Sequence, residues 1–225
     1  MKKLLTLFGF FVLCFGAQAD TLKLKLDLEL SIGITKFQQQ TNGIWYQEGF
    51  DHSLKLKSAS YSAKIFSHPS ANGWQVGVGY TYVGKAASEA VATASDANYD
   101  PIKKACVGPC WPLSHWYGAG TVQGVSLLAR KNFESGWYVE GGLMASRATY
   151  SVNIPDWIAC ATCATQNVTA TQPVKTLFDP TVAIGYRRGP WAASLSVVPT
   201  HMTDGSYAIF KGGSPILAIS YIIPL

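Results

Sequence analysis

Strict alternation of apolar and polar residues marks the first predicted element. From residue 22 to residue 34 every even position is leucine or isoleucine, and the odd positions carry charged residues, serine or glycine. A period of two residues is typical of a strand with one apolar and one polar face, whereas a helix would spread these leucines around its circumference. A strand of a soluble sandwich would show the same pattern, so this segment alone does not identify its surroundings.

Seven further segments alternate in the same way, which brings the number of predicted strands to eight. They cover residues 58–65, 74–82, 124–130, 137–146, 181–187, 191–197 and 217–225. Leu128 interrupts the polar face of the fourth strand, and the other strands keep their alternation. We therefore expect an all-β chain.

The connections between these strands are of two kinds. Three are short, at residues 67–73, 131–136 and 188–190, and four are long, at residues 36–57, 83–120, 152–180 and 199–214. Alternation of short turns with long loops is typical of transmembrane barrels, and an even strand count places both termini beside the short turns. The pattern predicts an eight-stranded antiparallel up-and-down transmembrane β-barrel with long extracellular loops.

Aromatic residues near the strand ends fit the two girdles of such a barrel. Trp74 and Tyr82 lie at opposite ends of the third strand, which at about 3.3 Å per residue and a tilt of about 40° places them roughly 20 Å apart across the membrane. The predicted girdle residues are Trp74, Tyr80, Tyr82, Trp137, Tyr186, Trp191 and Tyr221.

Composition agrees with a lipid-facing protein. Charged residues make up 14% of the 225 residues, against about 25% in a typical soluble domain. Residues 20–225 nevertheless contain no apolar run long enough for a transmembrane helix. Closed barrels are the other structures that satisfy their backbone hydrogen bonds within lipid.

The first nineteen residues predict a cleaved signal peptide. Lys2 and Lys3 precede an uncharged apolar stretch at residues 4–15, and Ala17-Gln18-Ala19 supplies a cleavage pattern before Asp20. Cys14 suggests a lipoprotein box, but the large residues before it argue against lipidation. We expect a signal peptide at 1–19, a barrel at 20–225, and export through the Sec pathway to the bacterial outer membrane.

With these features the chain resembles the small outer-membrane barrels that include the OmpA transmembrane domain. The resemblance rests on the signal peptide, on Gly-aromatic strand patterns such as residues 76–80 and 139–143, and on the final strand. It implies that the barrel-assembly machinery reads the C-terminal strand as a signal. Family members usually end on an aromatic residue, so Leu225 after Pro224 indicates a variant of that signal.

Charged residues fall on the polar, inward faces of the predicted strands. Arg130 and Glu140 lie symmetrically about Ser135 in one hairpin, so they should face each other and pair inside the barrel. Because eight strands leave just enough room for side chains, a plugged lumen is favoured over a gated ion path or a small ligand site. The predicted charge network comprises Lys25, Asp27, Glu29, Lys64, Arg130, Glu140 and Arg187.

Cysteines of the mature chain gather in two predicted loops. Cys106 and Cys110 lie in one loop, and Cys160 and Cys163 lie in another. In an oxidising compartment they predict disulfides, either within each loop or between the two loops. Four cysteines at these spacings could also bind zinc, but we predict no metal and no cofactor.

The outer rim offers residues for an enzymatic alternative, such as hydrolysis or lipid A modification. The candidate positions are Asp51, His52, Ser114, His115, His201 and Asp204. A nucleophile, a base and an orienting carboxylate need hydrogen-bond distances, which a sequence does not reveal, and four histidines among many serines produce such groupings by chance. We do not expect an enzyme.

The leading prediction is a structural or surface-interaction barrel that acts through disulfide-closed extracellular loops. Tyr99, Trp111, Trp116 and Tyr117 suit contact with lipopolysaccharide sugars or a protein, although we favour packing of the loop onto the barrel rim as the explanation for them. Expected partners are outer-membrane lipid and lipopolysaccharide, and an extracellular protein or glycan. Without Lys2 and Lys3 of the signal peptide the chain has 16 basic and 13 acidic residues, and this net charge of +3 is too small and too scattered to suggest nucleic acid.

Overall fold

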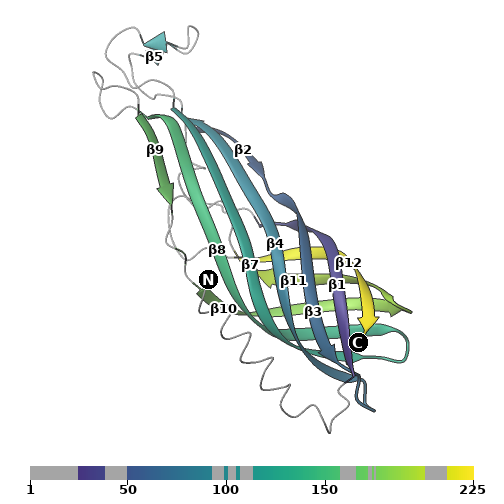
Figure 1. The fold of residues 1–225 in the computed structure, drawn as a ribbon. Helices are drawn as coiled ribbons and strands as arrows, with labels where there is room; N and C mark the ends of the chain where they lie inside the picture. Colours follow the sequence, from purple (N-terminus) through teal and green to yellow (C-terminus); the bar gives the residue numbers. More distant parts are fainter. Residues whose placement is uncertain are drawn as a thin grey trace.

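The protein is a closed antiparallel barrel of eight strands (Figure 1). The computed structural model describes residues 25–38, 50–92, 99–100, 105–106, 114–157, 166–171, 174, 176–200 and 212–225. The barrel strands are β1 (Leu26–Lys36), β3 (Lys57–Ser67), β4 (Trp74–Ala92), β7 (Ser114–Asn132), β8 (Trp137–Trp157), β10 (Thr176–Arg188), β11 (Trp191–Pro199) and β12 (Gly213–Pro224). Each pairs with the next, and β12 pairs with β1 to close the ring. The predicted fold class is confirmed.

Four short strands lie outside this ring. β2 (Phe50–Lys55) pairs with β4, and β9 (Gln166–Thr171) pairs with β8. Together with β4, β7 and β8 they form a sheet that extends beyond the barrel (Figure 1). β5 (Tyr99–Asp100) and β6 (Ala105–Cys106) form a separate two-stranded pair. No helix among the described residues is long and apolar enough to cross a membrane.

The three central strands are much longer than the sequence predicts. Residues 83–92 and 114–120 were expected in a loop, but they continue β4 and β7 and pair with each other. Their alanines, glycines and serines have low strand propensity, so the partner strand, more than local sequence, fixes their conformation. The loop predicted at residues 83–120 is correspondingly shorter.

A β-bulge in β4 explains why the alternation is lost at this point. The register shifts between Tyr82 and Gly84, so that Val83 and Ala86 both face inward. Gly84 has φ of +135°, and a Cβ atom there would lie 2.7 Å from the Cβ of Ser58. The extra residue of the bulge makes even-numbered residues face inward after it, whereas odd-numbered residues face inward before it. The alternation in the sequence is therefore interrupted at this point, and the predicted strand ends there.

The short turns share one construction. Gly73, Gly136 and Gly189 adopt positive φ, and a tryptophan follows each of them directly or after one proline. In the first two turns the glycine amide donates to the carbonyl three residues earlier, as in Gly73 to Ser70 at 2.8 Å. The turn chemistry therefore places one tryptophan at the same end of β4, β8 and β11.

Candidate functional site in the barrel lumen

The barrel exposes apolar side chains on its outside and encloses polar side chains. Outward residues are largely exposed on all the barrel strands, among them Ile32, Ile65, Val76, Leu127, Leu143, Val182, Leu195 and Leu217. Arg130, Gln75 and Glu29 face inward and are 1–2% exposed. A continuous apolar outer surface this large is typical of contact with lipid or with another protein.

Aromatic residues border this apolar surface at both ends. Trp74, Trp137 and Trp191 are about half exposed beside the short turns, and the rings of Trp191 and Tyr221 meet edge to face at 4.9 Å. At the other end Tyr61 stacks on Tyr82 at 4.7 Å. The chain has the fold of a small outer-membrane β-barrel.

The remaining predicted girdle residues lie at the same two levels. Tyr186 contacts Trp137 edge to face at 5.5 Å, and the hydroxyl of Tyr80 donates to Gln123 at 2.7 Å. Tyr61 was not predicted for the girdle, although it alternates with the serines of the second predicted strand.

Solved structures of bacterial surface barrels resemble the chain. The attachment invasion locus protein Ail of Yersinia pestis is 9% identical with a TM-score of 0.48, covering 90% of this chain and 100% of its own. OprG from Pseudomonas aeruginosa is 8% identical with a TM-score of 0.44, covering 89% and 96%. Neisserial surface protein A is 8% identical with a TM-score of 0.37, covering 88% and 96%. No protein-family model and no curated protein matches the sequence.

Arg130 lies at the centre of the charge network in the lumen. Its guanidinium approaches Glu29 at 2.7 Å and Glu140 at 2.6 Å, and it is 2% exposed. The second oxygen of Glu140 accepts from the Lys64 ammonium at 2.7 Å. Strands β1, β3, β7 and β8 thus each contribute one charged group. Buried ion pairs of this kind need all partners present to offset the cost of desolvation.

Two aromatic rings enclose the same guanidinium. Its Cζ lies 3.9 Å from the ring centroid of Phe66 and 4.3 Å from that of Tyr138. Tyr138 is directly opposite Gly185 in the neighbouring strand, and a Cβ atom at Gly185 would lie 2.3–2.6 Å from its ring and hydroxyl. The missing side chain of Gly185 therefore lets Tyr138 lie flat against β10 and cover Arg130.

A second polar layer lies nearer the short turns. The Gln75 amide donates to Asp27 at 3.3 Å and to the Ser67 carbonyl at 2.7 Å, and Asn132 donates to Gln75 at 2.7 Å. Arg187 lies 3.8 Å from Asp27 and is partly exposed. Lys25 precedes β1 and is exposed.

Sequence reasoning missed the neutral members of these layers. Phe66, Gln75 and Tyr138 occupy inward positions, and the signal that marks them is their place on the polar face of an alternating strand. Large side chains among serines and glycines on such a face indicate residues that fill the lumen.

Above the charged layer, small residues line a narrow cavity. It has a volume of about 30 Å³ and is bordered by serines and threonines of six strands, together with Lys64 and Glu140. A water molecule needs about 10–15 Å³ by this measure, so the cavity has room for a few waters and for no organic ligand.

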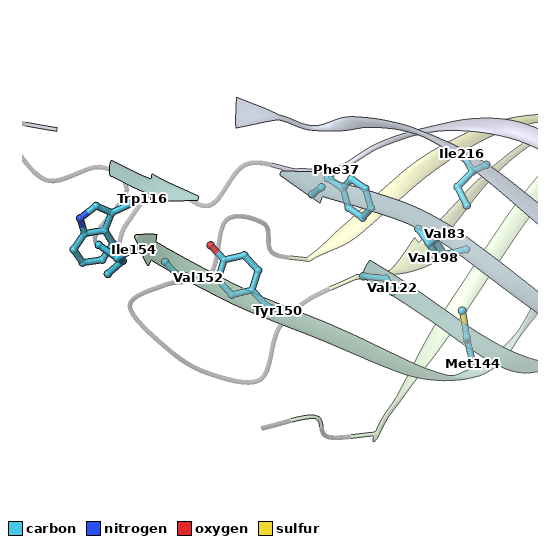
Figure 2. Packing of buried hydrophobic residues seen from close by; sticks show 11 residues of the cluster. Phe37, Val83, Trp116, Val122, Met144, Tyr150, Val152, Ile154, Val198 and Ile216 are labelled. Atoms are coloured by element: carbon cyan, nitrogen blue, oxygen red, sulfur yellow. The ribbon is translucent and has the colours of Figure 1, made fainter. Parts of the chain in front are cut away.

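A cluster of buried apolar residues begins at this cavity and continues toward the extended sheet (Figure 2). Met144, Val83, Val198 and Ile216 lie next to the cavity end, and Tyr150 continues the cluster toward the extended sheet. All five are at most 5% exposed. The lumen therefore contains charged, polar and apolar layers in succession.

The catalytic candidates lie at the end of the extended sheet farthest from the barrel or outside the described residues. The backbone register pairs Asp51 with Val91 and Val91 with His115. His52 pairs with Ala90, and Ser114 pairs with Ala92. His201 and Asp204 lie outside the described residues. The structure thus brings four of the six candidates to one end of one sheet.

The predicted disulfides concern residues that are mostly outside the described ranges. Cys106 ends β6 and pairs through its backbone with Tyr99, whereas Cys110, Cys160 and Cys163 fall outside those ranges. Among the described residues no group of three or more His, Cys, Asp or Glu side chains could hold a metal ion. Disulfide bonds in the loops stay a prediction.

Of the aromatics considered for partner contact, two are placed by the structure. Trp116 is buried against the apolar cluster at 6% exposure, whereas Tyr117 next to it is 47% exposed. Trp116 therefore packs within the protein, and Tyr117 is available to a partner on the outer face of β7.

Proposed function

We propose that the chain is an integral outer-membrane protein whose closed barrel is a scaffold for surface interaction through its loops. The observation that carries this proposal is the filled lumen beneath the extended sheet. A pore would need polar residues along its full length, but Met144, Val198 and Ile216 interrupt the polar lining. The barrel therefore anchors the loops, and the loops contact the partner.

Export and assembly belong to the same proposal. The signal peptide is removed before Asp20 after Sec export, and the assembly machinery recognises β12. Its outward residues Leu217, Ile219 and Tyr221 are 42–65% exposed, as a terminal signal strand requires. The partner is an extracellular protein or a glycan, and no cofactor takes part.

A folded membrane barrel is expected to change its mobility in gel electrophoresis when the sample is heated. The chain refolded in detergent should migrate faster in an unheated gel sample than after boiling, because the closed barrel resists the denaturing detergent until it is heated. A β-rich circular dichroism spectrum of the unheated sample is the control. Identical mobility of both samples would contradict the proposed barrel.

The filled lumen predicts a protein that does not conduct ions. Incorporation into a planar lipid bilayer should give no stepwise current, because the apolar layer near Met144 offers ions no replacement for their hydration. A porin added to the same bilayer serves as the positive control. Discrete current steps that disappear when the protein is omitted would favour the pore alternative.

The catalytic alternative has its own test. Lipid A extracted from expressing cells should show the same acyl pattern as lipid A from cells without the protein. A changed pattern that His115→Ala abolishes would establish an enzyme at the outer rim, and the scaffold proposal would then fail. Binding to host cells or glycans that depends on the loops would support the scaffold.

A further inference from the structure

Three lysines form an outward-facing row where the apolar surface ends. Lys36 of β1 is directly opposite Lys57 of β3, and the amide of Lys85 in β4 donates to the hydroxyl of Ser58 at 2.9 Å. All three side chains are exposed and lie on the outside of the barrel. We call Lys36, Lys57 and Lys85 the boundary lysine row.

The row continues into neutral hydrogen-bonding residues. Lys85 is opposite Thr121 of β7, which is opposite Thr149 of β8. The two threonine hydroxyls are hydrogen bonded at 2.6 Å. Five adjacent strands thus present ammonium groups and hydroxyls in one continuous row across the sheet.

Like charges placed directly opposite each other in a sheet repel and destabilise it. Nevertheless, within the described part of the chain, no carboxylate forms an ion pair with any of the three lysines. Other lysines do have partners, since Lys55 pairs with Glu89 at 3.3 Å and Lys64 pairs with Glu140 at 2.7 Å. The boundary row therefore concentrates positive charge that the described residues do not neutralise.

The position of the boundary lysine row relative to the membrane indicates which kind of molecule binds to it. On the side of the row nearer the short turns, the next outward residues are Ile34, Ala59 and Tyr82, and Tyr61 stacks on Tyr82. Beyond the bulge the outward face becomes polar, with Lys85 and Glu89 in place of apolar residues. Lysines directly above an interfacial aromatic cluster lie at the level of lipid headgroups.

We infer that the boundary lysine row binds the phosphate of a membrane lipid headgroup. Three adjacent strands span on the order of 10 Å, which flexible lysine side chains cross to converge on one phosphate. The hydroxyls of Thr121 and Thr149 add donors next to it. This inference rests on the proposed membrane insertion. It adds a lipid that would contact the outside of the barrel at the boundary lysine row.

The test compares lipid binding by refolded protein in neutral dodecylmaltoside micelles. Native mass spectrometry would measure the binding of dioleoyl phosphatidic acid, dioleoyl phosphatidylcholine and inorganic phosphate to the full mature chain. The wild type should prefer phosphatidic acid. A triple variant with Lys36→Gln, Lys57→Gln and Lys85→Gln should bind it on the order of 100-fold more weakly, since each lysine near an anionic surface typically contributes about 1 kcal/mol.

Lys55→Gln is the matched control, because Lys55 is exposed on the neighbouring strand but paired with Glu89, and its affinity should be nearly unchanged. Equal affinity of the triple variant and the wild type, or equal binding of inorganic phosphate and phosphatidic acid, would overturn the inference. Heat-modifiable mobility of each variant verifies that its barrel has folded. Loss of that mobility in the wild type would instead contradict the proposed membrane barrel.

Discussion

Replacing Arg130 by methionine is expected to lower the free energy of unfolding by about 3–5 kcal/mol. The guanidinium lies within 2.7 Å of Glu29 and 2.6 Å of Glu140, and both carboxylates are buried. Methionine restores much of the volume but leaves Glu29 without an ion-pair partner among the described residues. Glu140 retains Lys64, so the cost falls mainly on Glu29 and on the lost contacts with Phe66 and Tyr138.

Urea titration of the protein folded into lipid vesicles, followed by tryptophan fluorescence, measures this loss. Lys55→Met removes an exposed ion pair with Glu89 and should change the free energy of unfolding by about 0–1 kcal/mol. The double variant Arg130→Met with Glu29→Gln should recover part of the loss, because the buried charge is then gone. Equal stability of Arg130→Met and the wild type would show that the charge network does not stabilise the barrel.

Gly185→Ala is expected to destabilise the barrel by about 2–3 kcal/mol, a typical cost of overpacking a filled interior. The added Cβ would lie 2.3 Å from Cζ of Tyr138, so the ring must leave its place over Arg130. Because the Tyr138 ring packs on the Arg130 guanidinium, displacing the ring also disturbs Arg130. The loss of stability should therefore exceed what one added methyl group normally causes.

Gly141→Ala provides the matched control for this prediction. Gly141 lies on the adjacent strand β8, and a Cβ atom there would have no other atom within 4 Å. In the same urea titration the free energy of unfolding of Gly141→Ala should equal that of the wild type or exceed it slightly, because glycine is unfavourable inside a strand. Equal destabilisation by both variants would mean that the contact between Gly185 and Tyr138 has no special role.

The eight barrel strands could be predicted because lipid outside and side chains inside enforce a period of two residues. The tops of β4, β7 and β8 could not be predicted. In β4 the parity of inward residues reverses at the bulge beside Gly84, and the outward faces of the three strands carry polar residues such as Lys85, Thr121 and Thr149. Local alternation is then no guide, and pairing between distant segments decides the structure.

In the lumen, too, some contacts could be predicted from the sequence and others could not. The opposition of Arg130 and Glu140 could be predicted because both residues belong to one hairpin. The approach of Glu29 and Lys64 to the same centre depends on closure between β1 and β12, which a sequence does not specify. The close fit of Tyr138 on Gly185 likewise depends on the register between β8 and β10.

Spin-label accessibility along the outward faces of β4, β7 and β8 tests the central claim most directly. In a background with the mature cysteines replaced by alanine, single labels would be placed at Val76, Leu127, Glu89 and Thr149 of the vesicle-folded protein. Labels at Val76 and Leu127 should be accessible to oxygen and protected from a water-soluble nickel chelate. Labels at Glu89 and Thr149 should show the reverse. Nickel accessibility at all four positions would contradict a membrane-spanning barrel.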